Sequence, residues 1–443
     1  MTKRALSLAA LVAASAIALS GCSAGTSGST SGGDSGGVLK IAALEGGYGA
    51  DMYDEVAAAY EKLNPDIDVQ VQTSKSIEDE LTPNLQAGDY PDLVVLGQGR
   101  QAGLTETLIK DKALEDVSDV LTTTVPGEDV TVGDKLVDGV VGNLNTDPYG
   151  DGKTYLMPMY YSPTGLFYDT NLLESKGWAV PTTWDELFAL GDKAKAEGLS
   201  LFTYPTAGYL DGYFFSLLAD VGGEDFYTDV MTYKEDVWET PEAREALELT
   251  AKLLSYAAPT TVGYANQQDF TKNQQSILDG TTLFMPNGTW IVGEMADAPR
   301  TDGFAWGLTP LPAVEAGDER YITTSVESAW IPAAAENKDT AKDFMAYLYS
   351  DEAAKIFAAS DAIQPITGLA DSLDGDTKEF YSVYSDEGTK ALVGGFASTA
   401  PVEGVDIKTT LLNSADSIIS GDLSVDEWQA ELNEASNRLG AAS

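Results

Sequence analysis

The chain has no histidine and a single cysteine, Cys22, among its 443 residues. Without histidine there is no His-containing catalytic triad, no His general base and no His metal ligand. One cysteine allows neither an internal disulfide nor a Cys-rich metal site. These absences remove much of the enzyme repertoire, and we expect no metal ion, no other cofactor and no catalytic residue.

Basic residues are also scarce. The sequence has 26 lysines and arginines against 70 aspartates and glutamates, which gives a formal net charge of −44. Such a surface repels nucleic acid and anionic lipid, so we expect neither as a partner. The acidic residues are spread along the chain, which is typical of a solvated surface. A hydrophobic share of 43% is compatible with a folded core.

The first 37 residues differ in composition from the rest. Two basic residues precede an Ala- and Leu-rich run that is short for a membrane span, which predicts a signal peptide over residues 1–21. The run ends in LSGC, which resembles the lipobox of bacterial lipoproteins and implies lipidation of Cys22. Residues 22–37 are rich in Gly and Ser, as in a flexible tether. The expected location is the extracytoplasmic face of the cell membrane, held by a lipid anchor.

From Val38 onward, strand and helix patterns alternate, which predicts an open α/β sheet. The predicted elements are strands over 39–44, 67–71 and 93–96 and helices over 52–63 and 77–86. Ligands of such sheets bind beyond the carboxyl ends of the strands, here the loops 45–49 and 97–100. We select Tyr48, Gln98 and Arg100 from these loops as candidate ligand contacts.

Two short motifs in the same region do not fit cofactor sites. Gly97, Gly99 and Gly103 follow a strand, but their spacing has one residue too many for a dinucleotide fingerprint. The segment from Asn145 begins like an EF-hand calcium loop, but its twelfth position is Leu156 instead of a bidentate glutamate. We expect an exposed turn there and no metal.

Longer signatures follow. Within residues 155–190 an aromatic pair precedes a turn expected at 162–165, and Thr183 with Glu186 predicts a capping box where a helix begins. Residues 283–290 read LFMPNGTW, and residues 321–332 read YITTSVESAWIP. Together these stretches resemble the solute-binding proteins that feed carbohydrate ABC importers, the class that includes maltose-binding protein. The resemblance extends over essentially all of Val38 to Gly440.

This resemblance implies a two-lobed, periplasmic-binding-protein-like α/β fold with interleaved lobes and a hinge of three chain crossings. Lobe 1 would comprise residues 38–162 and 325–362, and lobe 2 residues 163–324 and 363–443. The solute would bind in the cleft between them and favour the closed form. The residues expected to contact it are Tyr48, Gln98, Arg100, Tyr161, Tyr209, Asp211, Asn287, Trp290, Glu327, Trp330 and Gln364.

The expected solute is an oligosaccharide. Aromatic planes pack on the apolar face of a pyranose, and carboxylates and Arg form charge-assisted hydrogen bonds with its hydroxyls. The loop around Tyr48 and residues 155–209 look most like the branch associated with N-acetylglucosamine-containing or N-glycan-type sugars. The family further implies a monomer that delivers its solute to ABC permease subunits and their ATPase.

Other readings remain open from sequence alone. A chain so rich in carboxylates contains many Asp/Glu pairs, so a secreted glycoside hydrolase is one alternative. A binder of a non-sugar solute such as a peptide is another. Trp290 and Trp330 also suit core positions, and the residue pattern does not decide which aromatic side chains face the cleft.

Overall fold

The computed structural model describes residues 37–100, 102–137, 139–397, 399 and 402–442. Gly36–Ser443 form one compact unit by themselves. The predicted signal peptide, Cys22 and all of the tether except Gly37 lie outside the described residues. Within the part that is described, no helix combines the length and the apolar character needed to cross a membrane.

A nine-stranded mixed sheet runs through this unit in the order β2-β1-β3-β8-β4-β6-β5, with β7 on β4 and β9 on β8. The strands are β1 (Gly37–Leu44), β2 (Ile67–Ser74), β3 (Leu93–Val95), β4 (Met157–Asp169), β5 (Ser200–Phe202), β6 (Thr282–Gly288), β7 (Trp306–Thr309), β8 (Arg320–Trp330) and β9 (Thr389–Leu392). β1 pairs in parallel with both β2 and β3, as expected from the strand–helix alternation.

The two longest strands, β4 and β8, connect the halves of the sheet. They pair with each other antiparallel from Met157↔Ala329 to Thr164↔Thr323. Residues 329–330 at the end of β8 pair with β3. Residues 164–169 in the second half of β4 pair with β6 and β7. A third segment lies beside them, because the N–H of Tyr161 donates to the carbonyl of Ile363 at 2.9 Å.

The turn expected at residues 162–165 is wrong, because these residues lie inside β4. Proline lacks an N–H and is tolerated in a sheet where a ladder bond is not needed. Pro163 meets this condition, since it pairs with Thr324 of β8 while the β6 ladder on the opposite side begins only at Thr164.

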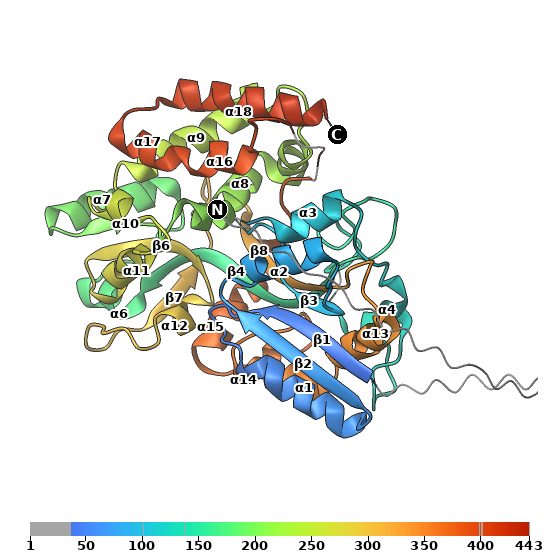
Figure 1. Cartoon of the computed structure of the whole chain (residues 1–443). Helices are drawn as coiled ribbons and strands as arrows, with labels where there is room; N and C mark the ends of the chain where they lie inside the picture. Colours follow the sequence, from blue (N-terminus) through green and yellow to red (C-terminus); the bar gives the residue numbers. More distant parts are fainter. Residues whose placement is uncertain (1–36, 101, 138, 398, 400–401, 443) are drawn as a thin grey trace, which may run out of the picture. The chain divides into compact units, whose positions relative to one another are not determined.

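Helices cover the sheet (Figure 1). The first group is α1 (Asp51–Leu63), α2 (Ile77–Ala87), α3 (Leu104–Lys110), α4 (Ser118–Thr122), α5 (Val132–Lys135), α6 (Thr170–Lys176), α7 (Trp184–Ala196), α8 (Leu210–Met231) and α9 (Pro241–Leu254). The second is α10 (Thr261–Tyr264), α11 (Phe270–Leu278), α12 (Ile291–Glu294), α13 (Lys338–Tyr347), α14 (Asp351–Ala359), α15 (Gly375–Ser382), α16 (Ile407–Leu412), α17 (Ser414–Ser420) and α18 (Val425–Gly440). Single 3-10 turns are η1 (Ala207–Tyr209), η2 (Val237–Glu239), η3 (Ala370–Ser372) and η4 (Val383–Ser385).

The helix start at Thr183 is found, but the capping box is only half formed. The Thr183 hydroxyl accepts from the N–H of Glu186 at 3.3 Å, whereas the Glu186 carboxylate accepts from the N–H of Thr182 at 2.8 Å. A reciprocal capping box occurs instead at α18, between Ser424 and Glu427.

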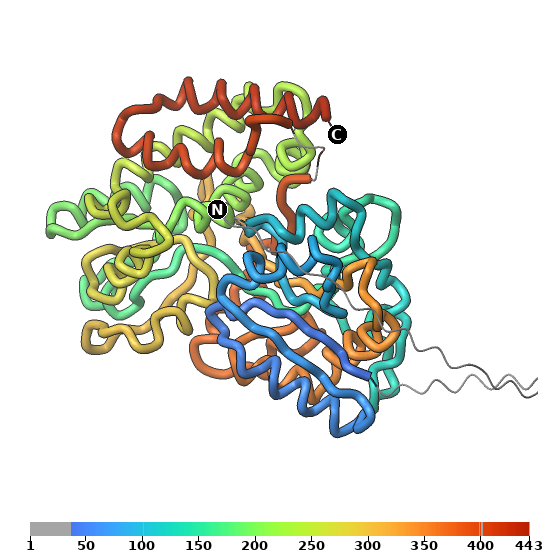
Figure 2. Tube along the Cα trace, viewed as in Figure 1, coloured from blue at the N-terminus to red at the C-terminus, as the bar shows by residue number. Residues whose placement is uncertain are grey.

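The buried apolar side chains form separate clusters on the two sides of the β4–β8 ladder. One cluster joins residues 39–160 to residues 329–362, for example Leu39 and Val95 to Ala329 and Phe344. Another extends from Leu166 through α8 and α9 to α16 and α18. Figure 2 shows the first of these arrangements as the orange 340–360 segment lying beside the blue N-terminal segment. The core near β1 is therefore completed by residues about three hundred positions later in the chain.

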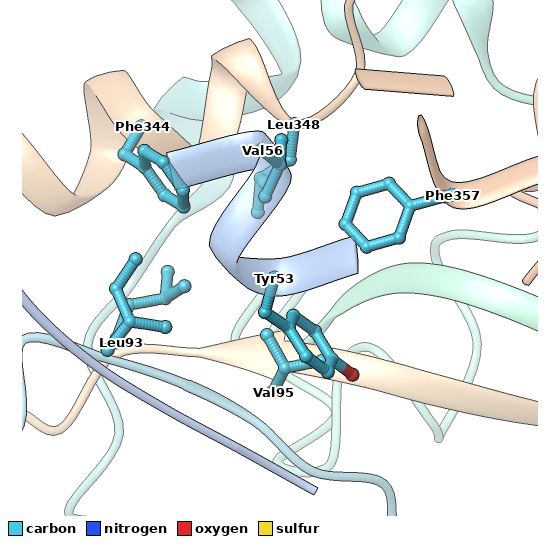
Figure 3. A pocket seen from close by; sticks show the side chains of 8 residues that line it. Tyr53, Val56, Leu93, Val95, Phe344, Leu348 and Phe357 are labelled. Carbon is cyan, nitrogen blue, oxygen red and sulfur yellow. The ribbon is translucent and has the colours of Figure 1, made fainter. Parts of the chain in front are cut away.

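The first core contains a cavity of about 10 Å³ beneath α1 (Figure 3). Its lining is apolar and includes Val56, Leu93 and Phe357. A space of this size is comparable to one water probe, and it offers a water no polar partners. It is a packing defect and not a solute site.

Candidate functional site

The candidate site lies where the loops after β1 and β3 meet α12, the start of α8 and the middle of β8. The hydroxyl of Tyr48 is hydrogen-bonded to the hydroxyl of Thr289 at 2.7 Å. Thr289 is bonded in turn to the hydroxyl of Ser162 on β4 at 2.9 Å, and its N–H donates to the same oxygen. Burial raises the pKa of Tyr48 to about 12, so the phenol is neutral at physiological pH. This chain of hydroxyls connects the N-terminal loop to residues far away in sequence.

Glu327 of β8 faces the loop that follows β3. Its carboxylate accepts a hydrogen bond from the N–H of Gly97 at 2.8 Å. Burial raises the pKa of this carboxyl, and the Gly97 hydrogen bond and the positive charge of Arg100 partly oppose the rise. A Cβ on Gly97 would lie 2.9 Å from the Glu327 carboxylate, so glycine is needed for this close approach.

The other two selected residues of this loop have protein partners. The Nε of Arg100 donates to the Glu78 carboxylate at 2.9 Å, and the Glu78 side chain is only 9% exposed. Gln98 donates its Nε2 to the carbonyl of Asn145 at 2.9 Å. Both side chains are half-buried and remain beside the site. The structure thus uses them to fix the loop, and Arg100 contributes positive charge next to Glu327.

A further part of the candidate site consists of Tyr209, Glu294 and Trp290. The hydroxyl of Tyr209 donates to Glu294 at 3.1 Å, and the Nε2 of Gln274 donates to the same carboxylate at 2.6 Å. The rings of Tyr209 and Trp290 are 6.4 Å apart between centroids. A Cβ on Gly288 would lie 2.2 Å from the Trp290 ring, so the ring covers this glycine. Burial raises the pKa of Glu294, and its two hydrogen bonds oppose that rise.

Two amide groups next to these residues each have one atom without a partner in the described part of the chain. Asn287 is 3% exposed, and its Nδ2 has no hydrogen-bond partner, while its Oδ1 accepts from the N–H of Gly288. Gln274 is fully buried, and its Oε1 is likewise without a partner. Unpaired buried polar atoms are costly and rare in folded proteins. The Nδ2 of Asn287 is therefore an available donor and the Oε1 of Gln274 an available acceptor next to Glu294 and Trp290.

Asp211, at the start of α8, lies near a lysine that the sequence did not indicate. Burial raises the pKa of Asp211, and the charge of Lys408 acts in the opposite direction. The same lysine approaches the loop after β3, because a Cβ on Gly99 would lie 3.1 Å from its Nζ. Lys408 thus places a positive charge between α8 and that loop.

Two of the predicted contacts are in the core instead. Trp330 is 0% exposed, and its indole N–H donates to the carbonyl of Leu96 at 3.0 Å. Residues three apart on a strand point to opposite faces, so Trp330 cannot share a face with Glu327. Gln364 is also 0% exposed and donates to the carbonyl of Leu348. Both residues leave the candidate set.

Tyr161 is half-buried within an aromatic group that the sequence did not reveal. Its ring centroid lies 5.1 Å from that of Tyr381 and 5.6 Å from that of Tyr384. The hydroxyl of Tyr381 donates to the carbonyl of Tyr161, and that of Tyr384 is bonded to Thr324. Tyr381, Tyr384, Lys408 and Glu294 were missed because no motif marks them and only the tertiary fold brings them here.

No group of three or more Cys, Asp or Glu side chains among the described residues is arranged to hold a metal ion. The groups that the structure brings together at the site are hydrogen-bond donors and acceptors beside aromatic faces. Carboxylates accept strong hydrogen bonds from neutral hydroxyls, and half-exposed rings can pack against apolar C–H surfaces.

The chain belongs to the bacterial extracellular solute-binding proteins, because the model of that family matches residues 43–355. It is 26% identical over 333 residues to the diacetylchitobiose-binding protein of Streptomyces coelicolor, covering 72% of this chain and 67% of the relative. It is 24% identical to the maltotriose-binding protein of Pyrococcus abyssi, covering 66% of this chain and 58% of that protein.

Solved structures share the fold. The apo form of RafE from Streptococcus pneumoniae matches with a TM-score of 0.70 at 20% identity, covering 92% of this chain and 99% of that one. A chitin oligosaccharide binding protein matches with a TM-score of 0.65 at 18% identity, covering 88% and 95%. The predicted two-lobed periplasmic-binding-protein fold and the predicted family are thereby confirmed. Both relatives compared by sequence are named as binding proteins.

Proposed function

We propose that this protein binds an oligosaccharide at the site described above and delivers it to the membrane subunits of an ABC importer. The observation that carries the proposal is that Glu294 of α12 and Glu327 of β8 both lie beside the loop after β1: a Cβ on Gly47 would lie 3.3 Å from the Glu294 side chain, and the charge of Glu327 acts on Tyr48. Neither carboxylate forms an ion pair with a described residue, and burial raises the pKa of both. Sugar hydroxyls would add charge-assisted hydrogen bonds to those that these carboxylates already accept from protein donors.

Trp290 and Tyr209 complete the proposed recognition. Both side chains are half-buried, so part of each ring is accessible. A pyranose ring would stack on such a surface while its hydroxyls reach the carboxylates and the unpaired Nδ2 of Asn287. We further propose an N-acetylglucosamine-containing or N-glycan-derived sugar, since the Streptomyces relative is named for diacetylchitobiose.

The proposed lobes are residues 38–162 with 325–362, and residues 163–324 with 363–443. This division is supported by the core clusters, which meet at the β4–β8 ladder. The three crossings would be β4, β8 and the segment near Ile363. A lipid at Cys22 would keep the monomer on the extracytoplasmic face of the membrane, beside its permease.

The test is calorimetric titration of residues 36–443 with chitobiose, N-glycan fragments, and α- and β-linked glucans and mannans, with a peptide panel in parallel. Micromolar or tighter binding with the sugar recovered intact is the expected result. Cleavage of a sugar would instead support the glycosidase alternative. Binding of peptides alone, or of no sugar, would contradict the proposal.

A further inference from the structure

Two glycines meet at the edge of the site. A Cβ on Gly293 of α12 would lie 2.0 Å from the carbonyl oxygen of Gly47. A Cβ on Gly47 would lie 2.8 Å from both the Cβ and the carbonyl oxygen of Trp290. Neither glycine has a positive φ in the described chain, so backbone conformation does not require glycine at these positions. Glycine is needed at these positions because the two backbones are in close contact.

A hydroxyl bridge stands next to this contact. Tyr48 follows Gly47 directly, and its hydroxyl is bonded at 2.7 Å to Thr289, which precedes Trp290. The Tyr48 ring also packs edge-on against Tyr160, with centroids 5.4 Å apart. The loop itself is tight, because the N–H of Gly49 donates to the carbonyl of Gly46 at 3.1 Å. The loop thus packs closely against a distant segment through its backbone and is hydrogen-bonded to that segment through the Tyr48 side chain.

We propose that residues 46–49 and 289–293 form a latch that holds the two lobes together without any solute. The contacts that make the latch are all between protein atoms, so they contribute before a sugar arrives. A closed form that is already populated raises the apparent affinity, because less of the binding free energy is used to close the protein. This inference concerns the regulation of the same site and rests on the lobe division of the proposed function.

The latch can be measured by the distance between the lobes. Residues 36–443 contain no cysteine, so two introduced cysteines would be the only label sites. Glu55→Cys on α1 and Lys193→Cys on α7 are exposed and belong to helices that pack on different cores. Pulsed electron paramagnetic resonance on spin labels at these positions, without solute, gives the distribution of distances.

Gly293→Ala should shift this distribution to longer distances, because the added methyl cannot occupy the space of the Gly47 carbonyl. Gly263→Ala is the matched control: this glycine is also in a short helix, has no positive φ, and its Cβ would meet no atom within 4 Å. Tyr48→Phe keeps the ring but removes the bond to Thr289, so it should give a smaller shift in the same direction. If Gly293→Ala does not fold, the distance distribution of Tyr48→Phe tests the latch in its place.

Distributions that are unchanged in both Gly293→Ala and Tyr48→Phe would overturn the proposal. The proposal would also be overturned if the labelled parent protein, with Gly293 and Tyr48 unchanged, showed only a long distance between the lobes. Because no sugar is present, these outcomes are independent of the titrations that test the proposed function. Loss of sugar binding with an intact latch would therefore be recognised as a failure of the function alone.

Discussion

The carboxylate of Glu327 accepts a hydrogen bond from the backbone N–H of Gly97 at 2.8 Å and so connects β8 to the loop after β3. This bond holds a candidate solute-binding group in place through a strand that is itself paired to β4. The position of the acid is thus coupled to the strands that join the two cores.

Glu327→Gln should change how stability depends on pH. Burial raises the pKa of Glu327 above its ordinary value of 4.5, so the folded state keeps this proton to a higher pH than the unfolded state. Its contribution to stability is therefore present at low pH and is lost as pH rises upward from 4.5 through the folded pKa. The variant lacks this loss, so its stability relative to the parent should increase with pH. Urea unfolding at several pH values gives the free energy of unfolding of both proteins. The prediction would be contradicted if this free energy changed equally with pH in the two. Glu55→Gln, exposed on α1, is the control.

Trp290→Ala should weaken sugar binding by about 1–3 kcal/mol, by analogy with the energies of aromatic stacking on nucleic-acid bases. The ring borders Tyr209 and covers Gly288, so its loss removes a stacking surface. Titration calorimetry with the sugar that binds in the panel of the proposed test measures the effect. Trp178→Ala is a suitable control, because this half-buried indole lies by Lys176 on another part of the chain. Unchanged affinity would remove Trp290 from the site.

Trp330→Phe should act on stability and not on affinity. The substitution removes the indole donor and leaves the buried carbonyl of Leu96 without this bond, at a cost of about 1–3 kcal/mol. The expected result is a lower urea midpoint with normal sugar affinity at temperatures where the variant is folded. A selective loss of affinity would return Trp330 to the site.

Leu93→Ala should destabilise the core beneath α1. Leu93 is 0% exposed and already lines a cavity, so the truncated side chain enlarges a space that water cannot fill favourably. We expect a loss of about 2–5 kcal/mol in the free energy of unfolding. Chemical unfolding measures it. A loss below that range would mean that the surrounding helices collapse into the space.

Cys22→Ser should release the protein from the membrane or leave its signal peptide uncleaved. The reason is that a lipid thioether requires the cysteine sulfur, and two or more acyl chains supply the anchoring free energy. Fractionation of cells and the mass of the mature N-terminus measure the outcome. A processed, membrane-bound Cys22→Ser protein would contradict the lipobox interpretation.

The elements near the N-terminus follow closely from periodicity in the sequence. The helix expected at 77–86 is α2 (Ile77–Ala87), and the strand expected at 67–71 is the first part of β2 (Ile67–Ser74). The turn expected around Pro163 failed because local composition cannot show that a proline faces an unpaired side of a ladder.

The site was less accessible to sequence reasoning. Trp290 and Trp330 have the same side chain, and only the fold decides that Trp290, at the start of α12, borders the site and that Trp330, at the end of β8, is in the core. The alternation of β8 gave a usable signal, since it separates Trp330 from Glu327. Nothing comparable marks Tyr384 or Lys408, whose roles depend on segments that meet only after the whole chain has folded.

The late completion of the first core has a consequence for biogenesis. Leu39 and Val95 pack with Ala329 and Phe344, so this core lacks essential members until most of the polypeptide has been synthesised. Contacts between residues so far apart carry a high loop-closure cost and form slowly. An emerging N-terminal segment consequently has no finished core to hold it folded. Export of an extracellular protein through a narrow channel requires a chain that has not yet folded, and a core that is completed late in synthesis is compatible with that requirement.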